Sequence, residues 1–317
     1  MTRDFSLSNP AVSVTAFLTL AVLWGGSFVA IEAGLHFFPP LLFAGVRYLL
    51  AGLVVLGYAA VVSDRWIPRD RTEWGAVAVA GTLVIAAYHA LLYVGELHIS
   101  GAVAAVLVSL SPVLTAAFAA ALLPSQRLGP VELGGFLLGV VGVVVVADPS
   151  LETLLSGGST ELFGAGLVLA GAATFALGAV LLRPLRNDFS IVPMQGWAMV
   201  VGAVVLFAGA GVRGESPAAV VWNATTVTTL AYLTLLSGVI AFLIYFALLD
   251  EVGPAQLHLV GYAEPITAAL ISWLVLGHLI ESRAMVGFLV ILAGFLVVER
   301  HAVRRVVDAR VPRDADA

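Results

Sequence analysis

Long apolar runs, separated by short polar segments, follow one another along almost the whole chain. A helix needs roughly 17–25 mostly apolar residues to cross the hydrocarbon core of a bilayer. The runs come near that length, and the fifth and the last are the shortest. We therefore predict ten transmembrane helices, at residues 11–31, 41–62, 74–96, 102–123, 131–147, 163–182, 191–211, 224–248, 255–276 and 284–298.

The composition agrees with a membrane protein and argues against several other classes. Hydrophobic residues make up 61% and charged residues 11% of the 317 residues, whereas soluble domains carry about 25% charged residues. The chain has no cysteine, so disulfides and cysteine-ligated metals are excluded. The sequence has no zinc-protease motif, phosphate-binding loop or serine-nucleophile motif, and we expect neither a metal nor another cofactor. The small net charge of −5 gives no reason to expect a nucleic-acid partner.

The placement of the basic residues predicts the orientation. All 15 of them are arginines. With the N-terminus inside and ten crossings, 12 arginines fall in cytoplasmic segments, two fall in outer segments, and Arg47 lies within a span. Cytoplasmic loops of membrane proteins carry the excess of positive charge. We therefore expect a multi-pass protein of the cell membrane with both termini in the cytoplasm.

The two halves of the chain resemble each other. Residues 102–123 match residues 255–276 at an offset of 153, and the match continues after a slip of one residue. The aligned residues include Ala102 with Ala255, Pro112 with Pro265, Gly135 with Gly287 and Gly142 with Gly294. The alternative to a duplication is chance similarity between apolar helices. Because five spans are an odd number, a duplicated second half would enter the membrane from the opposite side, which makes an inverted-topology repeat.

These observations predict an all-α integral membrane protein with ten transmembrane helices in two five-helix inverted-topology repeats. We place the first repeat at residues 1–155, the second at 156–300 and a polar cytoplasmic tail at 301–317. Proteins of this architecture usually bind substrate near the bilayer midplane, between the two repeats.

Several stretches resemble the EamA group of the drug/metabolite transporter superfamily. They are LWGGSFVAIEAG (23–34), FAGVRYLLAGL (43–53), AEPITAALISWLVLG (263–277) and GFLVILAGFLVV (287–298). The ninth span ends in Gly277-His278, where this family often has Gly-Glu, so no role of that carboxylate is carried over. The resemblance implies a ten-helix carrier of a small metabolite, an amino acid or a related compound, and often an exporter.

Polar residues within the spans are the candidate functional residues, because a polar side chain in hydrocarbon generally faces a neighbouring helix or a wet cavity. In the third span Thr82, His89, Tyr93 and Glu96 share one helical face, at i, i+7, i+11 and i+14. They either line a solute path or only bond to a neighbouring helix. Further candidates are Trp24, Ser27, Ser111, Thr115, Ser237 and Tyr245. For the serine and threonine hydroxyl groups, a hydrogen bond within their own helix is the alternative.

Arg47 is expected roughly 9 Å below the outer end of the second span. A guanidinium group keeps its charge and needs a partner or water. One interpretation is a structural ion pair with Glu96 or Glu32, and the other is attraction of a substrate carboxylate.

Glu264 is expected near the middle of the ninth span. The following Pro265 removes a backbone N–H and frees a carbonyl one turn earlier. The carboxyl group either couples transport to a proton, binds a cationic group or locks two helices together. Tyr262 is a candidate too, but it lies about 200° from Glu264 around the helix axis, and the sequence leaves open which face lines the path.

Secondary transport of a small solute by alternating access fits these features best. The alternatives are an intramembrane enzyme and a non-transporting sensor or scaffold, but the chain shows no catalytic motif and no appended soluble domain. The expected partners are a small solute, the lipid bilayer and a proton as coupling ion. The identity of the solute, the direction of transport and the oligomeric state are not determined by the sequence.

Overall fold

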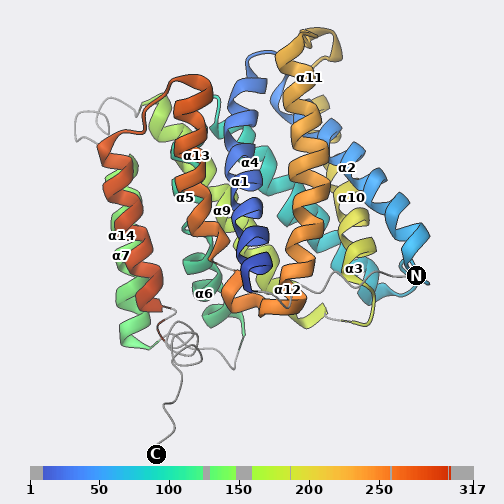
Figure 1. The fold of residues 1–317 in the computed structure, drawn as a ribbon, viewed down its shortest axis with the longest axis horizontal. Helices are drawn as coiled ribbons and strands as arrows, with labels where there is room; N and C mark the ends of the chain where they lie inside the picture. The colour runs from blue at the N-terminus through green and yellow to red at the C-terminus, as the bar shows by residue number, and fades with distance from the viewer. Residues whose placement is uncertain are drawn as a thin grey trace, which may run out of the picture.

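The computed structural model describes residues 10–123, 129–147, 159–185, 187–257, 259–298 and 300. Within this part of the chain every regular element is a helix and none is a strand. The helices, labelled as in Figure 1, are α1 (Pro10–Leu35), α2 (Pro40–Val62), α3 (Arg71–Val79), η1 (Ala80–Ala87), α4 (Tyr88–Gly95), α5 (Gly101–Val108), α6 (Ser111–Leu122), α7 (Pro130–Ala147), α9 (Thr160–Leu181), η2 (Arg183–Leu185), α10 (Ile191–Val212), η3 (Pro217–Ala219), α11 (Ala224–Ala231), η4 (Tyr232–Ile240), α12 (Ala241–Leu257), α13 (Val260–Leu276) and α14 (Ser282–Val298).

Each predicted span corresponds to a helix or to consecutive helices. Eight spans in the described residues are long and apolar enough to cross a membrane, and α13 and α14 are shorter apolar helices. The predicted start of the ninth span at residue 255 is wrong, because α12 continues to Leu257 and α13 begins at Val260. The sequence suggested a break at the polar residues Asp250 and Glu251 and at Pro254, but α12 continues through them. The predicted tail, 301–317, and the predicted boundary between the repeats lie outside the described residues.

The helices begin and end where local capping chemistry allows. Asp70 caps α3, since its carboxylate accepts hydrogen bonds from the backbone N–H groups of Thr72 and Glu73. Asn223 caps α11 in the same way. α13 ends at Gly277, whose φ of 72° lies in the left-handed region that glycine adopts without strain.

Three of the spans are interrupted. The third and the eighth contain the π-helical stretches η1 and η4. A π-helical turn holds more residues than an α-helical turn, so it rotates the face that the following residues present. The fourth span breaks between α5 and α6, just before Pro112, which has no backbone N–H to continue the ladder.

The helices form one bundle in which sequence-distant helices pack in pairs (Figure 1). α7 packs along α14 at one edge, and α2 packs along α10 at the other. Between them α1 lies against α13 and α4 lies against α9. Each of these four pairs joins a helix of the first half of the chain to one of the second half, so neither half forms a separate bundle.

The contact between α7 and α14 depends on glycines. A Cβ atom at Gly135 would lie 2.7 Å from the Gly294 carbonyl oxygen, and one at Gly142 would lie 2.7 Å from the Gly287 carbonyl oxygen. Backbones this close gain the van der Waals contact that drives helix association in membranes. The contacts are crossed relative to the sequence alignment: Gly135 meets Gly294 and Gly142 meets Gly287, whereas the alignment pairs Gly135 with Gly287 and Gly142 with Gly294. A crossed arrangement is the one expected between two equivalent helices related by a two-fold axis.

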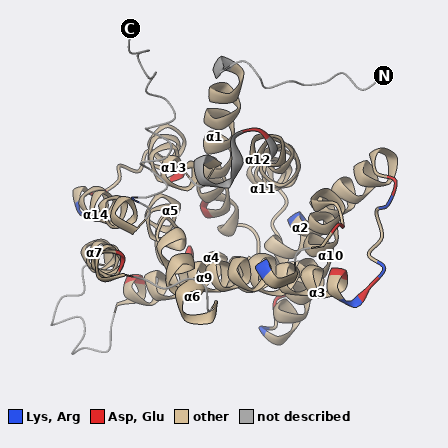
Figure 2. Cartoon of the chain, turned by 90° about the horizontal axis from the view of Figure 1, so that it is seen from below, with Lys and Arg blue, Asp and Glu red and all other residues tan. Residues whose placement is uncertain are grey.

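Charged side chains are sparse and gather in a few places. Seen from below, most of the chain is neutral, and basic and acidic residues cluster at the connection between α2 and α3 (Figure 2). There Arg65 forms an ion pair of 2.6 Å with Glu73. Many leucine and valine side chains are exposed on the outer faces of the helices, including Leu53, Val204 and Leu274. Such a surface suits hydrocarbon.

Candidate solute-binding centre

A buried arginine lies at the centre of the bundle's polar contacts. Arg47 of α2 is only 4% exposed. Its Nη1 donates to the Tyr93 hydroxyl of α4 at 2.8 Å, and its Nη2 donates to the Tyr48 hydroxyl at 3.0 Å. The guanidinium carbon also lies 4.4 Å from the centre of the Tyr48 ring. Neutral hydroxyl groups and aromatic faces, rather than a carboxylate, therefore surround this cation.

The hydrogen-bond network continues to His89 of α4. The Tyr48 hydroxyl lies 2.5 Å from His89 Nε2, and His89 Nδ1 lies 2.8 Å from the carbonyl oxygen of Ile85. A carbonyl oxygen only accepts, so Nδ1 carries a hydrogen, and in the neutral imidazole Nε2 then accepts from Tyr48. The Tyr48 hydroxyl then donates to His89 and accepts from Arg47. This chain orients the guanidinium group without neutralising it.

The expected ion pair between Arg47 and Glu96 or Glu32 is wrong. In the described residues Arg47 has no ion pair, and its Nε has no hydrogen-bond partner. Glu32 instead binds the Gly101 backbone N–H and His278. The guanidinium group donates to the hydroxyl groups of Tyr93 and Tyr48, whereas Glu96 follows α4 as its C-terminal cap, nearly one turn beyond Tyr93.

The third span brings part of its predicted polar face together. His89 and Tyr93 meet in the Arg47 network, and Glu96 is buried further along the same span. Thr82 does not join them, because its hydroxyl donates to the Ala78 carbonyl of its own helix at 2.7 Å. Thr82 lies in η1, and the π-helical spacing removes the i, i+7 relation to His89 that a regular helix would have.

Trp24, Ser237 and Tyr245 come together where α1 meets η4 and α12. The Trp24 ring of α1 lies 5.3 Å from the Tyr245 ring of α12, measured between centroids, and its Nε1 donates to the Ser237 carbonyl oxygen of η4 at 3.3 Å. Ser27 donates to the carbonyl oxygen of Trp24 within α1. An indole N–H and a tyrosine ring thus stand where α1 meets the eighth span.

Ser111 and Thr115 use their hydroxyl groups within the fourth span. Ser111 Oγ donates to the Val108 carbonyl at 2.6 Å, and Thr115 Oγ1 donates to the Ser111 carbonyl at 2.8 Å. These bonds satisfy carbonyls near the break between α5 and α6, which is the local role that such residues often have.

The two candidate residues of α13, Tyr262 and Glu264, have different neighbours. Tyr262 is buried, and its ring centroid lies 4.3 Å from that of Phe295 in α14. Glu264 lies within electrostatic range of Tyr88 in α4, and within the described residues its carboxylate has no hydrogen bond or ion pair. Tyr262 therefore packs on α14, while α13 as a whole lies against α1 and α5.

Tyr48 and Tyr88 belong to this centre, although sequence reasoning did not select them. Tyr48 links Arg47 to His89, and the Tyr88 ring lies 4.3 Å from the His89 ring, measured between centroids. The one available signal was the position of Tyr48 directly after the only arginine within a span. Tyrosines are ordinary in apolar helices, so spacing alone does not distinguish a functional one.

Comparison with known proteins agrees with this architecture. The chain is 28% identical to the uncharacterized inner membrane transporter YedA of Escherichia coli, over 86% of this chain and 89% of that protein. It is 26% identical to a chloroplastic WAT1-related protein of Arabidopsis thaliana, over 90% of this chain and 68% of that protein. A solved crystal structure with 20% sequence identity shares the fold, with a TM-score of 0.60, over 93% of this chain and 100% of that chain.

The sequence profile of one family covers most of the chain, in two separate segments. It matches residues 12–147 and residues 162–300. The first segment holds α1–α7 and the second holds α9–α14. Since the two matched segments together cover well over half of the chain, the chain belongs to the EamA-like transporter family.

Proposed function

We propose that this protein is a secondary transporter that moves a small carboxylate-bearing metabolite, such as an amino acid, outward across the cytoplasmic membrane by alternating access. The observation that carries the proposal is the burial of Arg47 without an anionic partner among the described residues. The resemblance to exporters supports the direction, and membership of a transporter family supports the reaction class.

Arg47 has the properties of a site for a carboxylate. A buried unpaired charge costs several kcal/mol even after the surroundings relax. Two tyrosine hydroxyls and an aromatic face offset part of that cost. Guanidinium has five N–H donors, and Nε has no partner. An incoming carboxylate would accept two parallel hydrogen bonds from such a group and would neutralise it.

Four observations support the inverted repeat that alternating access requires. Helices from opposite halves pack in pairs, the two aligned glycine pairs of α7 and α14 make crossed contacts, and the family profile matches two successive segments. The π-helical stretches also fall in the third and the eighth spans, which are equivalent in two five-helix repeats. In this arrangement α1, α4 and α13 would line the path between the halves.

Solute flux in sealed vesicles containing only this protein tests the proposal. Each amino acid is compared with the amine that lacks its carboxylate, and the solute is recovered to check that it is chemically unchanged. We expect wild-type protein to transport only the carboxylated member of a pair. Arg47→Gln should raise the apparent dissociation constant by about 10- to 100-fold, since a hydrogen bond to a charged group contributes about 1.5–3 kcal/mol.

Arg283→Gln is the matched control, because this arginine side chain is 53% exposed and near one end of α14. Its transport should equal that of the wild type. Thermal melting of each variant separates loss of binding from loss of folding. Wild-type affinity for carboxylated solutes in a folded Arg47→Gln protein contradicts the carboxylate site, and chemical conversion of the solute without flux favours an intramembrane enzyme.

Single-cysteine labelling tests the orientation. The chain has no cysteine, so one introduced at either end reports its own position without interference. A membrane-impermeant thiol reagent should label both ends from the cytoplasmic side only, as the arginine distribution predicts. Labelling of the two ends from opposite sides would exclude an even number of crossings.

A further inference from the structure

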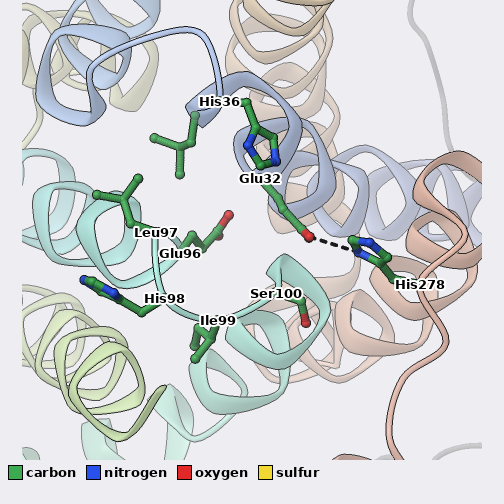
Figure 3. Close-up of a pocket in the computed structure, with 9 residues that line it drawn as sticks. Glu32, His36, Glu96, Leu97, His98, Ile99, Ser100 and His278 are labelled. Carbon is green, nitrogen blue, oxygen red and sulfur yellow. Dashed lines mark hydrogen bonds and ion pairs between the residues drawn. The ribbon is translucent and has the colours of Figure 1, made fainter. Parts of the chain in front are cut away.

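A second polar site lies at one end of the bundle, where α1, the α4–α5 connection and the loop after α13 meet (Figure 3). It is a pocket of about 380 Å³. The arginine distribution predicts that this end faces the outside of the cell. Its lining combines carboxylates, imidazoles and apolar side chains, from Glu32, Leu35, His36, Glu96, Leu97, His98, Ile99, Ser100 and His278.

Glu96 is the unusual member of this pocket. The residue is only 5% exposed, and within the part of the chain that the structure describes neither carboxylate oxygen has a hydrogen-bond partner. Figure 3 shows its carboxylate directed into the pocket, on the side where Glu32 lies. Buried polar atoms in folded proteins nearly always have a partner, and an unpaired buried carboxylate is strongly unfavourable. The pocket therefore lacks a group that would donate to Glu96.

Glu32 supplies a second carboxylate, which can accept further hydrogen bonds. Its Oε2 accepts from the Gly101 backbone N–H at 2.8 Å, and its Oε1 lies 3.2 Å from His278 Nδ1. Two carboxylate oxygens offer about four lone-pair positions, so further donors are accommodated. The Glu32 side chain is 12% exposed and the His278 side chain is 60% exposed, so the pocket runs from an accessible rim to the buried Glu96.

The lining indicates which class of cation fits. Within the described residues no group of three or more histidine, cysteine, aspartate or glutamate side chains is placed to hold a metal ion. A pocket of about 380 Å³ is also far larger than a bare ion needs. Leu35, Leu97 and Ile99 provide apolar surface beside the carboxylates, and an alkyl chain would cover it.

From this geometry we propose that the pocket binds a small organic ammonium ion. Its N–H groups donate to Glu96 and Glu32, and its alkyl part packs on Leu35, Leu97 and Ile99. An ammonium group carries three donors and one positive charge, which complements an unpartnered carboxylate and a partly occupied one. Arg47 does not line this pocket, and the site does not depend on the transport proposed above.

Calorimetric titration of the purified full-length protein with butylammonium chloride tests the site. Sodium chloride, magnesium chloride and neutral butanol are the comparison ligands. We expect saturable binding of butylammonium and much weaker binding of the other three. Glu96→Gln keeps the shape of the side chain and removes its charge, and it should weaken butylammonium binding by tenfold or more.

Glu281→Gln is the matched control, because this carboxylate lies in the same loop as His278, is 65% exposed and pairs with Arg283. It should bind butylammonium as the wild type does. Wild-type binding in a folded Glu96→Gln protein overturns the proposal. So does the absence of butylammonium binding to the wild type, or binding of sodium or magnesium with equal affinity.

Discussion

The glycines between α7 and α14 allow a sharp test of how this bundle is held together. Gly142→Ala adds one methyl group, whose carbon would lie 2.7 Å from the Gly287 carbonyl oxygen and 2.8 Å from the Ile291 nitrogen. Ordinary van der Waals contact begins at 3.4 Å, so the two backbones must separate by roughly 0.7 Å. Both neighbouring atoms belong to the backbone and cannot rotate away. Overpacking of this kind costs typically about 1–3 kcal/mol, and we expect a loss of about 2 kcal/mol.

Gly134→Ala is the control on the same helix. A Cβ atom at Gly134 would meet no atom within 4 Å, and alanine is favoured over glycine in a helix by roughly 0.5–1 kcal/mol. Tryptophan fluorescence during heating in one detergent should therefore show a lower melting temperature for Gly142→Ala and an equal or higher one for Gly134→Ala. Equal melting temperatures for the wild type and Gly142→Ala would show that the close approach does not stabilise the bundle.

Three further predictions use the same preparations. Gly294→Ala, at the position aligned with Gly142, would place a methyl carbon 2.6 Å from the Gly135 carbonyl oxygen. If the halves are related, the melting temperature of this variant should fall as far as that of Gly142→Ala. A much smaller shift would argue against equivalent packing. Asp70→Ala removes the cap of α3 and should cost about 1 kcal/mol of unfolding free energy, which denaturant titration measures; an unchanged midpoint would show that the cap contributes nothing. Glu264→Gln should abolish the response of flux to a pH gradient, because an amide does not exchange a proton in this range, and a retained response would exclude Glu264 as the coupling group.

Much of the candidate centre followed from polar residues in apolar helices, and its errors have clear physical causes. Arg47, His89 and Tyr93 were selected because hydrocarbon disfavours such groups, and they meet in one network. Thr82 was misplaced because the sequence does not signal a π-helical stretch, which depends on contacts with neighbouring helices. The partner of Arg47 was also misjudged: depth along a helix is readable from sequence, but the direction of a side chain is not.

The sequence by itself determined that the chain is a bundle of apolar helices, where most of them begin and end, and which family it belongs to. These properties are local, because hydropathy, caps and prolines act within one helix. Only the tertiary structure decided that Arg47 is held by tyrosines, that Tyr262 packs on Phe295 of α14, and that Glu96 lies in a pocket with no hydrogen-bond partner among the described residues. Such relations depend on how helices far apart in sequence rotate against one another. In a uniformly apolar chain the hydrophobic effect specifies burial in the membrane but scarcely distinguishes one rotation from another.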